Sequence, residues 1–403
     1  MTGQMSFAEC WAALARIGRE PVGGGYHRFA WTPTDRSLRS WFRDQAARRD
    51  LSLEADRNGN LWAWWGDPGA GAVVTGSHLD SVPGGGAFDG PLGVVSSFYA
   101  IDEMRRRGVT PSRPIAVVDF ADEEGARFGV ACMGSRLMTG ILAPDRARAL
   151  RDADGTSLGD AMTAAGVDAA AIGRDDQALD RIGTFVELHV EQGRSLVDLG
   201  AAVGVASAIW PHGRWRCSFT GEPNHAGTTR LGDRRDPMLP FAATVLAARE
   251  FAERNDAVAT IGKVVIDPGA VNGIASRVDA WLDTRAPDDA TVQTVLSGVT
   301  DAAERAADRH GVTVEVVQES YTPEVAFADD LRDRVSRLLD AAPQLPTGAG
   351  HDAGILSAFV PSTMLFVRNP TGISHSPAEH AEIDDCLAGV TALATVLTDL
   401  SIR

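Results

Sequence analysis

Short apolar runs alternate with longer helical patterns along the first half of the chain. The run Ala72–Gly76 predicts a buried strand, Leu92–Arg107 a helix and Ile115–Phe120 a second buried strand. A third strand is expected over Gly183–Val190. This alternation is typical of an α/β fold, in which a mostly parallel sheet is flanked by helices. Ligands of such sheets bind at the carboxyl ends of the strands, so chemistry is expected in the loops that follow them.

A different rhythm begins near Arg214. Apolar and polar positions alternate over 215–220, which predicts a half-buried antiparallel strand. The pattern then predicts a helix at 237–254, strands at 257–266 and 277–285, a helix at 288–310 and a strand at 312–318. The order β-α-β-β-α-β is the ferredoxin-like, split βαβ arrangement of an α+β sandwich. After about Pro323 the first rhythm resumes through 331–339, 363–367 and 385–400. We therefore expect a discontinuous main domain, residues 1–210 with 324–403, and an inserted domain, residues 211–323.

Composition and charge narrow the function classes. The 403 residues are 44% apolar and 23% charged, which is the balance of a globular protein with more than one domain. A net charge of −16 disfavours nucleic acid and anionic membrane surfaces as partners. We find no signal-peptide core and no run of 18 apolar residues, so no membrane segment is expected. The four cysteines are scattered without CxxC spacing, which favours reduced thiols and a cytoplasmic protein.

Histidine and acidic residues gather at the expected strand ends. GSHLDS brings His78 and Asp80 to the end of the first strand, and GGGAFDG adds Asp89. ADEEG brings Glu123 and Glu124 to the end of the second strand. Adjacent glutamates point in different directions, so one can bind a metal while its neighbour acts as general base. The alternatives are a solvated histidine with a turn aspartate, a solvated acidic face, and a phosphate loop, although no GK[ST] follows the glycines.

Further histidines strengthen the metal interpretation. Glu187, His189 and Glu191 share one face of the third predicted strand, which is unusual for a buried strand unless a cation satisfies them. A half-exposed edge strand is the alternative. His351 and His375 follow later, each close to a carboxylate. Imidazoles and carboxylates without cysteine are ligands that zinc or manganese takes.

Two features of the inserted domain are candidates for substrate binding. His225 lies in GEPNHAGTT, a segment too polar and glycine-bounded for a core. Arg285 ends a predicted strand and can bind a carboxylate in bidentate fashion. A structural ion pair between Arg285 and Asp283, which share a strand face, is the alternative.

Eight motifs in order resemble the dinuclear-metal amidohydrolases that cleave N-carbamoyl-L-amino acids, β-ureidopropionate and allantoate. These enzymes are relatives of the aminoacylase and carboxypeptidase superfamily. The motifs, spread over about residues 60–385, are GSHLDS, GGGAFDG, DEEGARFG, ELHVEQG, GEPNHAGTT, DTR, AGHDA and ISHSPAE. The resemblance implies a metallopeptidase-like catalytic domain with an inserted lid and dimerisation domain. It also implies hydrolysis of the ureido or amide C–N bond of N-carbamoyl-L-amino acids or related ureido acids. The alternative is an aminoacylase, an N-formyl amino acid deformylase or a dipeptidase that uses the same metals.

The resemblance also implies a set of roles. Two divalent ions per subunit, zinc or else manganese or cobalt, are expected, with His78 and His189 as terminal ligands of one and the other site. Asp89 is expected as the bridging ligand, Glu124 and His375 as the remaining ligands, and Asp80 as the residue that orients His78. Glu123 is the expected general base, and His225 is expected to stabilise the oxyanion, sometimes from a partner subunit.

The expected substrate is a small molecule with a carboxylate. Its α-carboxylate would bind Arg285, with further contacts from Gln192, Asn272 and His351. A homodimer through the inserted domain is expected. Because His225 and Arg285 belong to the insert and the ligands to the other domain, catalysis should require domain closure.

Overall fold

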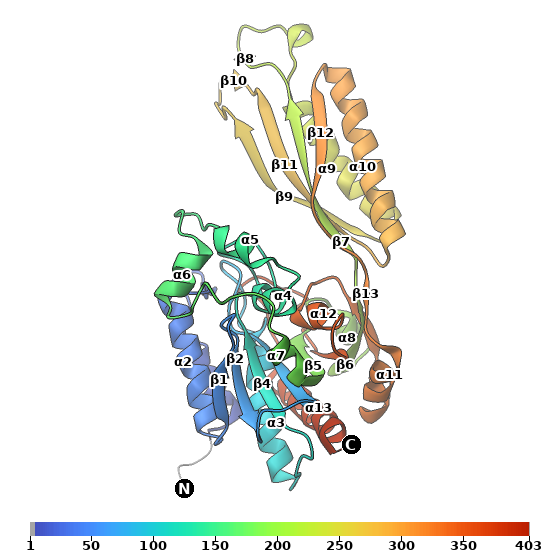
Figure 1. Cartoon of the computed structure of the whole chain (residues 1–403). Helices are drawn as coiled ribbons and strands as arrows, with labels where there is room; N and C mark the ends of the chain where they lie inside the picture. The colour runs from blue at the N-terminus through green and yellow to red at the C-terminus, as the bar shows by residue number, and fades with distance from the viewer. Residues whose placement is uncertain (1–4, 403) are drawn as a thin grey trace. The chain divides into compact units, whose positions relative to one another are not determined.

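The computed structural model describes residues 5–402, which form two compact units (Figure 1). The main unit contains the chain up to Ser207 and from Phe327 onward, and the insert is Ala208–Ala326. The sequence patterns place the borders of the insert at 211 and 323, and the compact units divide at 208 and 326. Each unit has its own sheet and its own hydrophobic core.

A nine-stranded sheet organises the main unit, in the order β1-β2-β4-β3-β5-β15-β6-β13 with β14 paired to β6. The central strands β4, β3, β5 and β15 run parallel, whereas pairs toward both edges are antiparallel. The prediction of a mostly parallel sheet is therefore correct for the central strands. The strands are β1 (Ser52–Ala55), β2 (Leu61–Trp65), β3 (Ala72–His78), β4 (Ile115–Phe120), β5 (Ile182–Val190), β6 (Val203–Ile209), β13 (Val325–Ala326), β14 (Gln344–Thr347) and β15 (Ser362–Val367).

Helices cover the sheet, and every residue of the central strands β3, β4 and β15 is therefore buried. Alternation along β5 directs Leu188 toward Gly389 of α13, and directs Glu187 toward Ala353 of α12. α3 packs beside α13 against β3 and β5. The helices are α1 (Phe7–Leu14), α2 (Pro33–Ala47), α3 (Pro91–Arg106), α4 (Met133–Thr139), α5 (Pro144–Ala149), α6 (Leu158–Ala164), α7 (Asp176–Arg181), α8 (Ser195–Asp198), α11 (Asp329–Leu338), α12 (Asp352–Leu356) and α13 (Ile383–Ile402).

α13 is the one helix of the described chain that is long and apolar enough to cross a membrane. Its side chains Leu393, Val396 and Leu397 are fully buried in the core of the main unit. The contacts with α3 and with β15 explain this burial, because α13 packs beside α3 against the sheet. The apolar composition of α13 is thus that of a core helix.

The insert holds an antiparallel four-stranded sheet in the order β12-β7-β11-β9. Its strands and two helices follow one another in the predicted β-α-β-β-α-β order. A separate two-stranded ribbon, β8 with β10, extends from the sheet. The elements are β7 (His212–Thr220), β8 (Asn224–His225), the short 3-10 helix η1 (Leu231–Asp233), α9 (Met238–Arg254), β9 (Val258–Asp267), β10 (Gly273–Ile274), β11 (Arg277–Arg285), α10 (Asp289–His310) and β12 (Thr313–Thr322).

Candidate functional residues lie at the strand ends of the main sheet. Gly76 of β3 has φ +150, and a Cβ at this position would lie 1.9 Å from the carbonyl oxygen of Val118 in β4. Only glycine permits this close approach of the two strands. Two residues later β3 ends at His78, beside the end of β4 and next to β5, which contains His189. Parallel pairing therefore gathers both histidines at one edge of the sheet.

Candidate metal centre

Asp89 lies at the centre of a cluster of histidines and acids that is buried apart from the half-exposed His375. Its Oδ1 atom is 3.2 Å from Nε2 of His189 and 3.5 Å from Nε2 of His78. Its Oδ2 atom is 3.4 Å from Nε2 of His375. The two oxygens of one carboxylate thus face different histidines.

The potential ligands fall into two trios that share this carboxylate. One trio is His78, Asp89 and His189, and the other is Asp89, Glu124 and His375. The ligand atoms of each trio lie within 4.8 Å of one another. The expectation that His78 and His189 serve different sites is wrong. Because β3 and β5 are neighbouring parallel strands, both rings reach the same oxygen of Asp89.

The side chains of this cluster fit divalent cations. His78 Nε2 and Glu124 Oε1 are buried and form no hydrogen bond with any described residue. Buried polar atoms without partners cost free energy, and a cation would satisfy them. Imidazole nitrogens and carboxylate oxygens are the donors that zinc and manganese bind. A carboxylate shared between two groups of ligands is suited to a two-metal site.

The ionisable groups of the cluster perturb one another. Burial raises the pKa of Glu124 to about 7, and the charge of Asp89 adds to the effect. A hydrogen bond with Asp89 raises the pKa of His375 to about 9, although burial opposes it. Burial disfavours ionised Asp89, but His189 and the other two histidines outweigh this and hold its pKa well below the usual range. Metal ligands must be deprotonated, so cations would displace protons from Glu124 and His375.

Glu123 lies beside the cluster but in neither trio. Its Oε2 atom is 3.7 Å from His78 Nε2, and its Oε1 atom accepts a hydrogen bond of 3.2 Å from the Cys132 thiol. Burial raises the pKa of Glu123 well above its usual range, His78 opposes the shift and the charge of Asp352 adds to it. A carboxyl group with a raised pKa can accept and return a proton near neutral pH. Sequence reasoning missed the contact with Cys132, because no metal or redox spacing marks this cysteine.

Asp80 contacts both His78 and the loop of the two glutamates. Its Oδ1 atom is 3.4 Å from His78 Nδ1. The same carboxylate accepts hydrogen bonds from the backbone N–H groups of Glu123, at 3.1 Å, and Glu124, at 3.0 Å. One side chain therefore links a ligand on β3 to the candidate base and to a ligand after β4.

Gln192 contacts the shared carboxylate in this structure. Its Nε2 atom donates a hydrogen bond of 2.8 Å to Oδ2 of Asp89, while its Oε1 atom is buried without a partner among the described residues. His351, the other substrate-binding candidate of the main unit, is buried with its ring centroid 4.5 Å from that of His189. Its Nε2 atom also has no hydrogen-bond partner in the described chain. Both residues thus present polar atoms beside the two trios.

The acids of β5 and its following loop do not face Asp89. Glu187 forms a third possible trio with His189 and His351, but Ser77 Oγ and the Ala353 N–H already donate to its carboxylate at 2.8 and 3.0 Å. Glu191 follows β5 and accepts hydrogen bonds from the backbone of Ser195 and Leu196 at the start of α8. Of the three residues predicted to share this strand face, His189 is therefore the one that contacts Asp89. Backbone N–H groups therefore satisfy both glutamates, and the Ser77 hydroxyl also donates to Glu187.

The candidate residues of the insert lie at two different ends of it. His225 is exposed and pairs with Gly273, and the N–H of the next residue, Ala226, donates to the carbonyl of Asn272. Arg285 is the last residue of β11, and its guanidinium binds Asp283 at 2.8 Å. β11 runs for nine residues, so Arg277 and Arg285 are about 26 Å apart at about 3.3 Å per residue. His225 and Asn272 lie beyond the Arg277 end.

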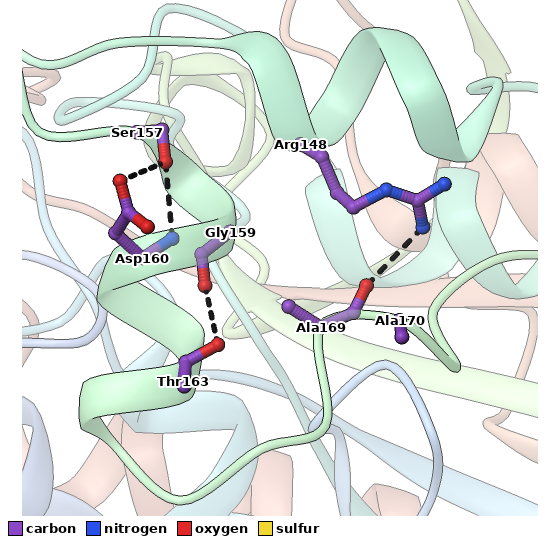
Figure 2. A pocket seen from close by; sticks show the side chains of 7 residues that line it. All are labelled: Arg148, Ser157, Gly159, Asp160, Thr163, Ala169 and Ala170. Carbon is purple, nitrogen blue, oxygen red and sulfur yellow. Dashed lines mark hydrogen bonds between the residues drawn. The ribbon is translucent and has the colours of Figure 1, made fainter.

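A pocket of the main unit is lined by one acid, Asp160, and by no histidine (Figure 2). Its polar groups bond one another: Ser157 Oγ donates to Asp160, and Arg148 donates to the carbonyl of Ala169. Thr163 Oγ1 donates to the carbonyl of Gly159. These satisfied groups contrast with the buried, partnerless atoms around Asp89.

Similarity to known proteins extends over most of the chain. The model of peptidase family M20/M25/M40 matches residues 74–399. The chain is 36% identical over 392 residues to an N-carbamoyl-L-amino acid amidohydrolase of Geobacillus stearothermophilus, with 94% of each protein covered. It is 33% identical over 399 residues to the allantoate amidohydrolase of Escherichia coli K12, with 96% of each covered. A solved amidase of the hydantoinase/carbamoylase family from Burkholderia vietnamiensis has a TM-score of 0.88 at 29% identity, covering 99% of this chain and 98% of that one.

Gly90 offers a test of how tightly the first trio is built. It has φ +81, and a Cβ there would lie 2.3 Å from Cε1 of His78. We expect Gly90→Ala to displace the ring and to lower the affinity for Mn²⁺ by about 10- to 100-fold, as loss of a ligand's supporting contacts does. Calorimetric titration of the metal-free protein measures this change.

Gly84→Ala is the matched control for this test. Gly84 belongs to the same loop and has φ +68, but a Cβ there would meet no atom of the described chain within 4 Å. The control thus also places alanine at a positive φ, but without the contact to His78, and should keep the wild-type affinity. Equal losses in the two variants, or wild-type affinity in Gly90→Ala, would contradict the geometry.

Proposed function

This chain belongs to peptidase family M20/M25/M40, and we propose that it hydrolyses the ureido C–N bond of N-carbamoyl-L-amino acids or related ureido acids such as allantoate. The observation that carries the proposal is the pair of ligand trios sharing Asp89, with Glu123 held separately beside them. The similar proteins named N-carbamoyl-L-amino acid amidohydrolase and allantoate amidohydrolase, each matched over more than nine-tenths of the chain, support the substrate class.

Two divalent cations, zinc or else manganese or cobalt, would be held by the two trios. His78, Asp89 and His189 would bind one, and Asp89, Glu124 and His375 the other. Such ions, when bound, supply Lewis-acid activation of a water molecule and of the substrate carbonyl.

Glu123 would carry the proton through the reaction. Cys132 holds its Oε1 atom, which leaves Oε2, the oxygen nearer to His78, to take the proton of the attacking water. As the C–N bond breaks, the protonated Glu123 would give this proton to the leaving nitrogen. The burial that raises its pKa favours the protonated form between the two transfers.

Arg285 would bind the substrate carboxylate. Its Nε and Nη2 atoms donate to the two oxygens of Asp283, which fixes the plane of the guanidinium. A planar, oriented guanidinium suits bidentate recognition of a carboxylate better than a lysine does. Because the trios lie in the main unit and Arg285 in the insert, catalysis would require closure of the two.

We also propose that the enzyme acts as a homodimer through the insert. A ureido acid has its carboxylate only a few covalent bonds from the carbon that is attacked. His225 and Arg285 lie at opposite ends of the insert sheet, so one insert cannot bring both to one substrate. His225, with Asn272, would therefore act on the substrate of the partner subunit. α9 and the edge strand β9 expose the apolar surface that such a dimer would bury, namely Leu239, Val245, Leu246, Val258, Val264, Val265 and Ile266.

A substrate panel tests the reaction. With Mn²⁺, Co²⁺ or Zn²⁺ added, we expect kcat/KM for an N-carbamoyl-L-amino acid or allantoate to exceed that for N-acetyl and N-formyl amino acids and dipeptides by at least about tenfold, or about 1.4 kcal/mol. Glu123→Gln should lose about 10²- to 10⁴-fold in kcat while keeping its metal content. A preference for dipeptides would overturn the substrate class, and an active Glu123→Gln would remove Glu123 from proton transfer.

Mixing inactive variants tests the dimer. Equal amounts of Glu123→Gln and His225→Ala, dissociated and reassociated at random, should recover about a quarter of wild-type activity, because half the dimers then contain one complete site. Glu123→Gln mixed with Arg285→Ala is the control and should recover nothing, since both residues act in the same subunit. No recovery in the first mixture would contradict the exchange of His225 between subunits.

A further inference from the structure

Glu379 links the loop of Asp89 to the loop of His375. Its Oε1 atom accepts hydrogen bonds from the backbone N–H groups of Phe88, at 2.8 Å, and Asp89, at 2.9 Å. The hydroxyl of Ser374 lies 3.2 Å from Glu379 Oε2 and 3.2 Å from Oδ2 of Asp89. Glu379 itself is only 4% exposed. One buried carboxylate thus contacts the backbone of the shared ligand and the side chain next to His375.

The glycine-rich loop before Asp89 is shaped around Glu379. A Cβ on Gly86 would lie 2.3 Å from Glu379 Oε1, so only glycine allows the carboxylate to approach this closely. The backbone N–H groups that a phosphate-binding loop would offer to a ligand are here bound to Glu379. The loop therefore binds a carboxylate of its own chain.

The two trios differ in what supports them. His78 and His189 belong to the paired strands β3 and β5, and their Nδ1 atoms contact the carbonyls of Asp80 and Val190. In the second trio, Glu124 and His375 lie on loops, and His375 is half-exposed with φ +55. Strand pairing thus fixes the two histidines of the first trio, whereas loop contacts such as those of Glu379 fix the second trio.

We propose that Glu379 is a positioning residue that sets the affinity of the second trio for its cation. It holds Asp89 and the Ser374–His375 segment together, so that Oδ2 of Asp89 stays within reach of His375. Two ions would then bind with unequal affinity. The binding of the less tightly held ion, at the second trio, would depend on Glu379. This inference rests on the dinuclear centre of the proposed function.

Titration of the metal-free full-length protein with Mn²⁺ alone tests the proposal. The wild type should bind two equivalents. Glu379→Ala should bind the first with unchanged affinity and the second about 10- to 100-fold more weakly. Glu379→Gln keeps an acceptor for the two backbone N–H groups and should lose less. Glu382→Gln is the control and should match the wild type, because Glu382 is an exposed acid that pairs with His380.

Several results would overturn the proposal. These are wild-type binding of both equivalents by Glu379→Ala, equal weakening of both, or a single equivalent in the wild type. If Glu379→Ala does not fold, Ser374→Ala removes the hydroxyl contacts with Glu379 Oε2 and Asp89 Oδ2 but leaves the bonds of Glu379 Oε1 to the backbone, and it should weaken the second equivalent selectively. No substrate is present in this titration, so a wrong substrate class would leave its result unchanged.

Discussion

Asp89 divides its two oxygens between two groups of imidazoles and acids, and much of the main unit keeps it in that position. The strand ends of β3 and β5 bring His78 and His189 to Oδ1. Gln192 and Ser374 contact Oδ2 on the side of His375. The loop that carries Asp89 is in turn bound through its backbone to Glu379. The position of Asp89 therefore rests on contacts from strand residues, from neighbouring side chains and to its own backbone.

The same arrangement explains why burying these side chains costs free energy and why the site is reactive. Burying several acids beside one another raises the pKa values of Glu123 and Glu124, because each loses water and faces the charges of its neighbours. Cations would compensate the acids of the trios, while Glu123 stays outside the trios with a thiol on one oxygen. The site thus separates groups that bind metal from a group that moves a proton.

The sequence predicted the helices and strands better than the contacts between them. Apolar periodicity located β4 and β11 at the bounds that the structure has, because each is a short run with clear flanking residues. The motifs also predicted that His78, Asp89, Glu124 and His375 are ligands of one metal centre. The sequence could not assign His78 and His189 to one trio, because that depends on β3 and β5 being neighbours in the sheet. The contacts of Cys132 and Glu379 were missed for a similar reason, since each is created by folding and has no spacing signal.

Anomalous diffraction from crystals of the manganese-loaded protein tests the sharing of Asp89 most directly. The account predicts two anomalous peaks about 3.5–4 Å apart, the separation of two-metal sites. One peak should contact His78 and His189, the other Glu124 and His375, with Asp89 between them. A single peak, or two peaks that do not share Asp89, would contradict the account.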